Sequence, residues 1–140
     1  MFNKILVAID GSKEGDKALD YAIELARGFK SMLGIVYIVV LPTLPYTEFP
    51  LATPSQEELR KVGEEILSKG KNKAMSAEIN AEVILLQGDA ADEIIRVAES
   101  RGYELIVVGS RGLSKIAQFF LGSVSSRVVR HSKRPVLVVR

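Results

Sequence analysis

The chain has 140 residues and a formal net charge of +2; 47% of its residues are hydrophobic and 26% are charged, values typical of a soluble globular domain. It has no cysteine and a single histidine, His131, which excludes disulfides, thiolate metal sites and any Ser-His catalytic pair that does not use that histidine. Its longest apolar run, residues 34–41, is far below the ~20 residues that cross a bilayer, and Asp10 interrupts the apolar start before it could form a signal peptide. We therefore expect a single domain over residues 1–140, cytoplasmic and not associated with a membrane.

Residues 4–9 form a nearly unbroken run rich in isoleucine and valine, which is typical of a strand buried on both faces. Asp10-Gly11-Ser12 ends this run, and Ser12 is expected to cap a helix. The apolar positions of that helix share one face: Ala18, Leu19, Ala22, Ile23, Ala26 and Phe29. Residues 35–41 predict a second strand, and a β-α-β succession of this length predicts a right-handed crossover between parallel strands.

Residues 42–54 contain four prolines and no helical period, so we expect a loop that either folds over a ligand or simply connects two elements. Ser55-Gln56-Glu57-Glu58 has the pattern of a capping box. The helix that it opens has apolar positions at Leu59, Val62, Ile66 and Ala74, while Gly63 and Gly70 weaken it and its charges indicate an outer face.

The remaining elements continue the alternation. Residues 81–86 predict a short strand with polar flanks at the edge of the sheet, and Asp89 is expected to cap a helix whose inward positions are Ala91, Ile94, Ile95 and Ala98. Residues 105–108 predict a fourth strand, residues 122–131 a fourth helix and residues 136–139 a last strand. Five strands alternating with four helices predict an α/β fold with an open, doubly wound, Rossmann-like parallel sheet and helices on both faces.

Basic residues accumulate towards the end of the chain. From Arg101 onward there are eight basic residues and one acid, Glu104, which favours an anionic ligand in this third of the chain. No aromatic side chains interleave with these basic residues to stack on bases, so we expect no nucleic-acid partner. Solvated helix faces would account for about half of these charges.

The most informative stretch is residues 107–112, followed by a glycine and serines at residues 122–126. Glycines let the backbone approach a ligand closely, and a helix N-terminus attracts an anion through its free N–H groups and its dipole. Ser123 and Ser125 would add hydroxyl donors. A helix C-cap glycine and a serine N-cap joined by an ordinary loop is the alternative, but three glycines with Arg111 and Lys115 between them favour a phosphate-binding turn.

The spacing Gly109-x2-Gly112-x9-Gly122-Ser123 resembles the nucleotide motif of the ATP-binding branch of the universal stress protein family. The resemblance extends from Lys4-Ile5-Leu6-Val7-Ala8-Ile9-Asp10-Gly11-Ser12 to Arg134-Pro135-Val136-Leu137-Val138-Val139. It implies the strand order 3-2-1-4-5, which puts the ends of the first and fourth strands side by side at the point where the winding reverses. The ligand that it implies is ATP, or ADP or AMP, with Mg²⁺ or Mn²⁺.

The resemblance also implies site residues. Gly109 and Gly112 would lie along the ribose and phosphates, with Gly122, Ser123, Val124 and Ser125 around the phosphates and Arg111 screening their charge. Ile38 and Val108 would enclose the adenine. Ala8, Asp10, Gly11 and Ser12 would come from the first turn, where Asp10 would meet the ribose or a metal-bound water instead of ligating a metal directly. Alternatively, Asp10 is a helix-start carboxylate that supports Ser12.

Motifs that the chain does not contain narrow the function. No G-x-x-x-x-G-K-[ST] occurs, no G-x-G-x-x-G follows the first strand, and no carboxylate pair or His-based nucleophile is evident. We therefore predict an ATP-binding stress-response or signalling module that hydrolyses ATP slowly or not at all without an as yet unknown partner protein. A slow ATPase or a phosphoryl- or adenylyl-transfer enzyme using Asp10, Lys13 and Arg111 is the alternative.

Two further expectations concern phosphorylation and assembly. A response-regulator-like receiver phosphorylated on Asp89 would have the same architecture, but the first turn offers one acidic residue where a receiver uses a pair. The apolar last strand, residues 136–139, has only Arg140 after it, and exposed edges invite pairing. Because the family commonly dimerises through that strand, we expect a homodimer.

Overall fold

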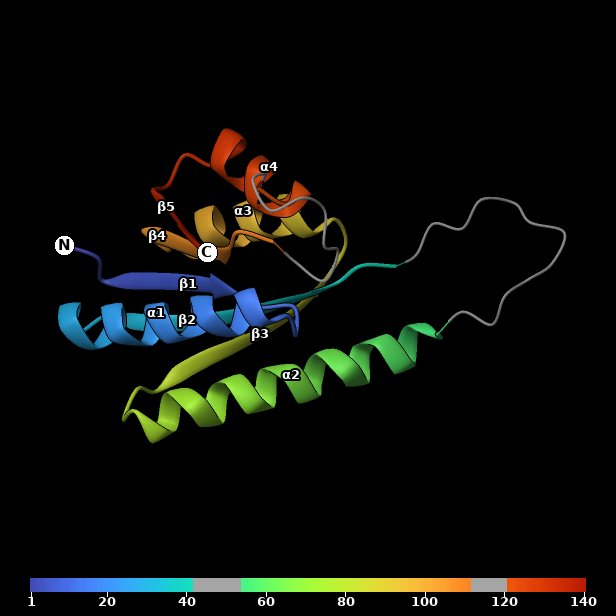
Figure 1. The fold of residues 1–140 in the computed structure, drawn as a ribbon, viewed down its shortest axis with the longest axis horizontal. Helices are drawn as coiled ribbons and strands as arrows, with labels where there is room; N and C mark the ends of the chain where they lie inside the picture. Colours follow the sequence, from blue (N-terminus) through green and yellow to red (C-terminus); the bar gives the residue numbers. More distant parts are fainter. Residues whose placement is uncertain (42–53, 112–120) are drawn as a thin grey trace, which may run out of the picture.

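The computed structural model describes residues 1–41, 54–111 and 121–140. Within these ranges strands and helices alternate (Figure 1). In chain order they are β1 (Lys4–Ala8), α1 (Lys13–Phe29), β2 (Met32–Val39), α2 (Gln56–Ser76), β3 (Ala81–Gln87), α3 (Ala90–Ser100), β4 (Leu105–Gly109), α4 (Ser123–His131) and β5 (Val136–Val139).

The strands form one parallel sheet in the order β3-β2-β1-β4-β5. The central strand is β1, in which Ile5 pairs with Leu33 of β2 on one side and with Leu105 of β4 on the other. The sheet winds outward through β2 and β3, then returns to place β4 and β5 on the opposite side. The doubly wound, Rossmann-like fold and its strand order are therefore confirmed.

Helices cover both faces of the sheet, with α1 and α2 on one side and α3 and α4 on the other (Figure 1). Alternate residues of β1 serve the two sides, because side chains alternate across a strand. Ile5 and Val7 belong to the core under α1 and α2, whereas Leu6 belongs to the core under α3. Two buried faces explain why the strands read as continuous apolar runs.

Some boundaries and inward positions differ from the prediction. β2 spans Met32–Val39 instead of the predicted residues 35–41. It begins earlier because the Met32 N–H already pairs with the carbonyl of Asn3 beside β1. Phe29, predicted to face inward, is 41% exposed and packs edge-on against Phe2. β3 lies at the edge as predicted, but with seven residues it is longer than the five-residue β1.

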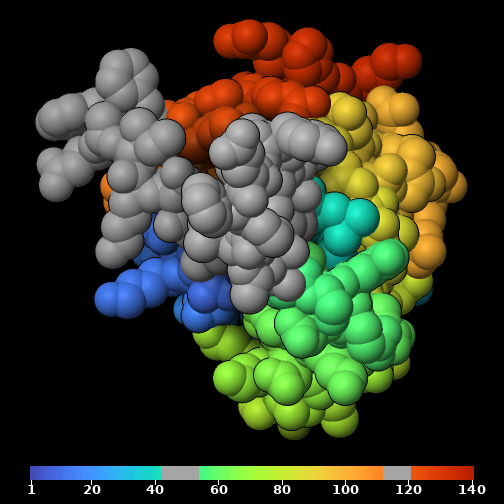
Figure 2. Space-filling view, turned by 90° about the vertical axis from the view of Figure 1, so that its right-hand side faces the viewer, coloured from blue at the N-terminus to red at the C-terminus, as the bar shows by residue number. Residues whose placement is uncertain are grey.

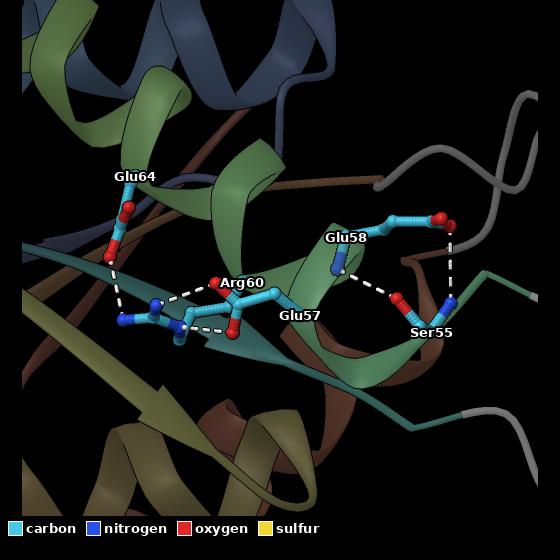
Figure 3. A network of polar contacts seen from close by, with 5 residues as sticks. All are labelled: Ser55, Glu57, Glu58, Arg60 and Glu64. Carbon is cyan, nitrogen blue, oxygen red and sulfur yellow. Dashed lines mark hydrogen bonds and ion pairs between the residues drawn. The ribbon is translucent and has the colours of Figure 1, made fainter.

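The capping box of α2 is confirmed. Ser55 Oγ accepts a hydrogen bond from the Glu58 N–H, and the Ser55 N–H donates to Glu58 Oε2, both at 3.1 Å (Figure 3). One turn further on, Arg60 pairs with Glu57 and Glu64 on the exposed side of the helix. These contacts are local in sequence, so a short pattern was enough to predict the cap.

The two glycines of α2 have a different role from the one predicted. Gly63 and Gly70 are buried, and a Cβ placed on Gly63 would lie 2.7 Å from Tyr37 Cδ1 of β2. Val62, predicted to face inward, is instead 47% exposed. The glycines therefore mark the packing face of α2 and let the helix approach the sheet closely.

Candidate functional site

The first and fourth strands end side by side. β1 pairs with β4 from Ile5 with Leu105 to Val7 with Val107, so the turns that follow the two strands emerge at the same end of the sheet. Figure 2 faces this end, with α2 in green, α3 in yellow and α4 in red around it. In doubly wound sheets, ligands bind at such a switch point.

A cavity of about 180 Å³ lies at this end, on the α3 and α4 side of the sheet. Its walls are mostly aliphatic, and among the described residues that line it Asp10 is the only charged one. The lining consists of Ala8, Ile9, Asp10, Gly15, Val36, Ile38, Val40, Ala90, Ile94, Val108, Gly109 and Val124. The volume is below the ~300 Å³ at which pockets for drug-sized ligands begin.

Asp10 supports the start of α1. Its Oδ1 accepts hydrogen bonds from the N–H (2.9 Å) and the Oγ of Ser12, and Ser12 Oγ accepts one from the Gly15 N–H at 3.0 Å. Gly11 between them has φ +87°, a conformation that favours glycine. Gly15 has no Cβ to obstruct this network, since one would lie 2.9 Å from Asp10 Oδ1. Asp10 thus supports the Ser12 cap at the start of α1 and also lines the cavity.

Gly109 ends β4 beneath the first turn of α1. A Cβ at this position would lie 2.8 Å from the backbone carbonyl carbon of Glu14. A side chain here would push α1 away from β4, so close packing by itself requires a glycine. The same residue lines the cavity. Gly109 therefore both lets α1 pack closely on β4 and forms part of the cavity wall.

The start of α4 is attached to the end of β4. The Gly122 N–H donates to the carbonyl of Ser110 at 2.6 Å, and Ser125 Oγ donates to the same carbonyl at 2.9 Å. Ser125 is only 2% exposed, whereas Ser123 is exposed. The Ser125 hydroxyl also lies 3.1 Å from the carbonyl of Gly122, but its shorter contact connects α4 to the end of β4.

The N-terminus of α4 differs from those of α1, α2 and α3. A side chain caps each of those helices, namely Ser12, Ser55 and Asp89, and each has acidic residues in its first turn. In the described residues, α4 has Gly122 at its N-cap, no side-chain cap bond and no acid in its first turn. The first N–H groups of a helix have no acceptor within the helix, and they carry the positive end of its dipole. The N–H groups of residues 123–125 are thus suited to an anion.

Two ion-pair systems include residues next in sequence to residues that line the cavity, because Glu14 precedes Gly15 and Asp89 precedes Ala90. Arg111 Nη2 lies 3.4 Å from Glu14 Oε1. Arg127 of α4 pairs with Asp89 at 2.9 Å and with Asp92 at 3.0 Å, and the hydrogen bond from Arg127 is the largest cause that lowers the pKa of Asp89 below its ordinary value. Asp89 also caps α3 by accepting a hydrogen bond from the Asp92 N–H. Phosphorylation of Asp89, as in a receiver, would require it to lose its contacts with Arg127 and with the start of α3.

The described residues contain neither a group of metal ligands nor a membrane-spanning helix. Across residues 1–41, 54–111 and 121–140, no three His, Asp or Glu side chains are grouped to hold a metal ion. No helix in the same ranges is both long and apolar enough to span a bilayer.

Six of the expected site residues line the cavity: Ala8, Asp10, Ile38, Val108, Gly109 and Val124. Gly11, Ser12, Arg111, Gly122, Ser123 and Ser125 lie in the turns beside it and do not line it, and Gly112 lies outside the described residues. Sequence reasoning missed Ile9, Gly15, Val36, Val40, Ala90 and Ile94. A period of two from Ile38 would have found Val36 on the same face of β2 and Val40 just beyond the end of the strand. The residues of α3 offered no comparable pattern.

Comparison with known proteins identifies relatives over the whole chain. A family model described as the Universal stress protein family matches residues 1–140. Universal stress protein YxiE of Bacillus subtilis is 41% identical, with all of both chains covered. A crystal structure of a universal stress protein family member from Burkholderia pseudomallei is 30% identical with a TM-score of 0.78, covering 99% of this chain and 96% of the other.

A further solved structure carries information about a ligand. It is a universal stress protein in complex with cAMP, 28% identical, with a TM-score of 0.76, covering 99% of this chain and 97% of the other. The TM-scores of the two solved structures show that they share the fold described above. The chain belongs to the universal stress protein family.

Proposed function

We propose that this chain is an ATP-binding universal stress protein, a single-domain cytoplasmic module that binds adenine nucleotides with Mg²⁺ or Mn²⁺, hydrolyses ATP little by itself and signals to a partner protein. The observation that carries the proposal is the uncapped, acid-free start of α4 beside an aliphatic cavity. The relative solved with cAMP supports an adenine nucleotide as the ligand class.

The cavity is the proposed site of the base. A nucleobase is flat and largely apolar on its faces, and Ile38, Val40 and Val108 supply aliphatic walls. Asp10 Oδ1 is already engaged by Ser12, so Oδ2 is the oxygen that would accept a ribose hydroxyl or a metal-bound water. The phosphates would then extend towards residues 122–125.

The phosphates are the proposed ligands of α4. Backbone N–H groups at a helix start bind phosphate through hydrogen bonds and the helix dipole, and here no carboxylate of the first turn opposes an anion. A divalent cation would be held mainly by the phosphates, because Asp10 is the only carboxylate among the described lining residues. Because Asp10 is the only carboxylate among the described residues that line the cavity, catalysis there by a pair of acids has no support, and for this reason we propose low turnover.

Calorimetric titration with ATP, ADP and AMP tests the proposal, together with the shift in melting temperature at saturating ATP and Mg²⁺. We expect binding, a higher melting temperature and loss of both on Gly122→Leu. The backbone of Gly122 has φ −61° and ψ 163°, which any residue adopts, so backbone strain would not explain the loss. The matched control is Gly28→Leu in α1, where a Cβ meets nothing within 4 Å, and this variant should bind ATP normally. Absence of heat for all three nucleotides would overturn the proposal.

We also propose a homodimer through β5. β5 is the last strand in the sheet order, and Val136, Leu137 and Val138 are only half-buried. An unpaired edge of this kind can add strands of a second copy. Light scattering should give a mass of about two chains at micromolar concentration, and a monomer there would contradict this assembly.

A further inference from the structure

Arg111 and Glu14 form an ion pair that connects the two turns of the site. Arg111 follows β4, and Glu14 lies in the first turn of α1; their closest atoms, Nη2 and Oε1, are 3.4 Å apart. The backbone and Cβ of Glu14 pack closely on Gly109. A Cβ added to that glycine would lie only 2.8–2.9 Å from these Glu14 atoms. Glu14 therefore has a fixed position at the border of the cavity.

The pair can be exchanged for another partner. Its contact of 3.4 Å is longer than the 2.7–2.9 Å of a strong charge-assisted bond, and the Arg111 and Glu14 side chains are 31% and 23% exposed. Phosphate oxygens match the fork of a guanidinium at least as well as a carboxylate does, and ATP brings more negative charge than one glutamate. Arg111 is thus placed to leave Glu14 for a phosphate.

The charge left behind would oppose binding. Once Arg111 turns to a phosphate, Glu14 loses the one ion-pair partner that the described residues give it. Its carboxylate then remains unpaired in the first turn of α1, next in sequence to Gly15, which lines the cavity. Asp10 and Asp16 add negative charge around the same helix start. By contrast, no acid lies in the first turn of α4.

We propose that Glu14 competes with the nucleotide phosphates for Arg111 and thereby weakens ATP binding. This inference rests on the proposed nucleotide function and adds to it an affinity-limiting residue outside the lining of the cavity. In the nucleotide-free chain the guanidinium pairs with Glu14, and this pair must break before Arg111 can bind a phosphate.

A double-mutant cycle on the ATP dissociation constant tests the competition. Glu14→Gln should tighten ATP binding about two- to fivefold, the range that an exposed ion pair supplies. Arg111→Gln should weaken ATP binding. If the two residues compete as proposed, Glu14→Gln raises the ATP affinity more in the wild-type background than in the Arg111→Gln background. The reason is that Arg111 is present to be released only in the wild-type background. A carboxylate that merely repels phosphate would give an equal or larger gain in the Arg111→Gln background.

The matched control lies on the same helix. Glu24 pairs with Arg27 at the same 3.4 Å near the other end of α1, and Glu24→Gln should leave ATP affinity unchanged. Melting curves without nucleotide confirm that each variant is folded. If the wild-type chain binds no ATP, the proposed function fails and the competition falls with it. If the wild-type chain binds ATP but Glu14→Gln gives no gain, or a gain in the Arg111→Gln background that equals or exceeds the gain in the wild type, only the competition is wrong.

Discussion

Ser125 Oγ donates a hydrogen bond of 2.9 Å to the carbonyl oxygen of Ser110, fifteen residues earlier in the chain. The bond links the end of β4 to the first turn of α4. It bridges residues 112–120, which lie outside the described part of the chain. A buried serine therefore positions the N–H groups that we propose as the phosphate site.

Ser125→Ala removes this link, while the Gly122 N–H still bonds to Ser110. We expect the free energy of unfolding to fall by about 1 kcal/mol, the net value of one buried hydrogen bond, and ATP binding to weaken because α4 is held less firmly. Urea denaturation and calorimetry measure the two effects. Ser123→Ala, in the same turn but exposed, is the control for stability, and equal losses in the free energy of unfolding for the two substitutions would contradict the positioning role of Ser125.

Gly34→Ala tests the packing of Tyr103 on β2. A Cβ on Gly34 would lie 2.6 Å from Tyr103 Cζ, and Tyr103 is fully buried, so one of the two must move. We expect a loss of about 1–3 kcal/mol in the free energy of unfolding, the usual cost of overpacking a core, measured by urea denaturation. Gly28→Ala should act in the opposite direction, raising stability by about 0.5–1 kcal/mol through helix propensity, because nothing lies within 4 Å of its Cβ. A neutral Gly34→Ala would show that the ring has room to shift.

Tyr103 makes stability depend on alkaline pH. Burial, and then its hydrogen bond to Glu82, raise the pKa of Tyr103 to about 12. A folded-state pKa above the unfolded value means that its contribution is complete below pH ~10 and is lost as the pH rises towards 12. The loss amounts to about 2–3 kcal/mol at 1.36 kcal/mol per pKa unit.

Tyrosinate absorbance and urea denaturation between pH 9 and 12 measure this titration. Lysines also titrate in that range, so the informative quantity is the difference between the wild type and Tyr103→Phe. The stability of the variant should decline less steeply with pH. Parallel curves for the two proteins would mean that Tyr103 ionises at its ordinary pKa.

The elements of the fold could be predicted because their signals are local. Ser12, Ser55 and Asp89 cap α1, α2 and α3 as expected, each through a bond to the backbone three residues on. The strands are apolar runs because helices cover both faces of the sheet. The strand order came from the family resemblance instead, since no local pattern specifies which strands are neighbours.

The site could be predicted only in part. The glycine motif was predicted from the spacing of its glycines, and Asp10 from its place in the turn after the first strand together with the family resemblance. Ala90 and Ile94 were missed, since aliphatic residues of α3 look alike whether they line a cavity or fill a core. Ser125 was expected to face the phosphates, and its burial against Ser110 depends on how α4 returns to β4.

The sequence by itself determined the alternation of strands and helices, the three capped helix starts and the position of the glycine motif, because these depend on residues a few positions apart. Only the tertiary structure decided that Gly63 allows α2 to contact Tyr37, that Gly109 makes room for Glu14, and that Arg111 pairs with that glutamate. Each of these contacts joins segments far apart in the chain. Which residues meet in these contacts depends on how the helices cross over the sheet. That arrangement cannot be predicted from residues that are close together in the sequence.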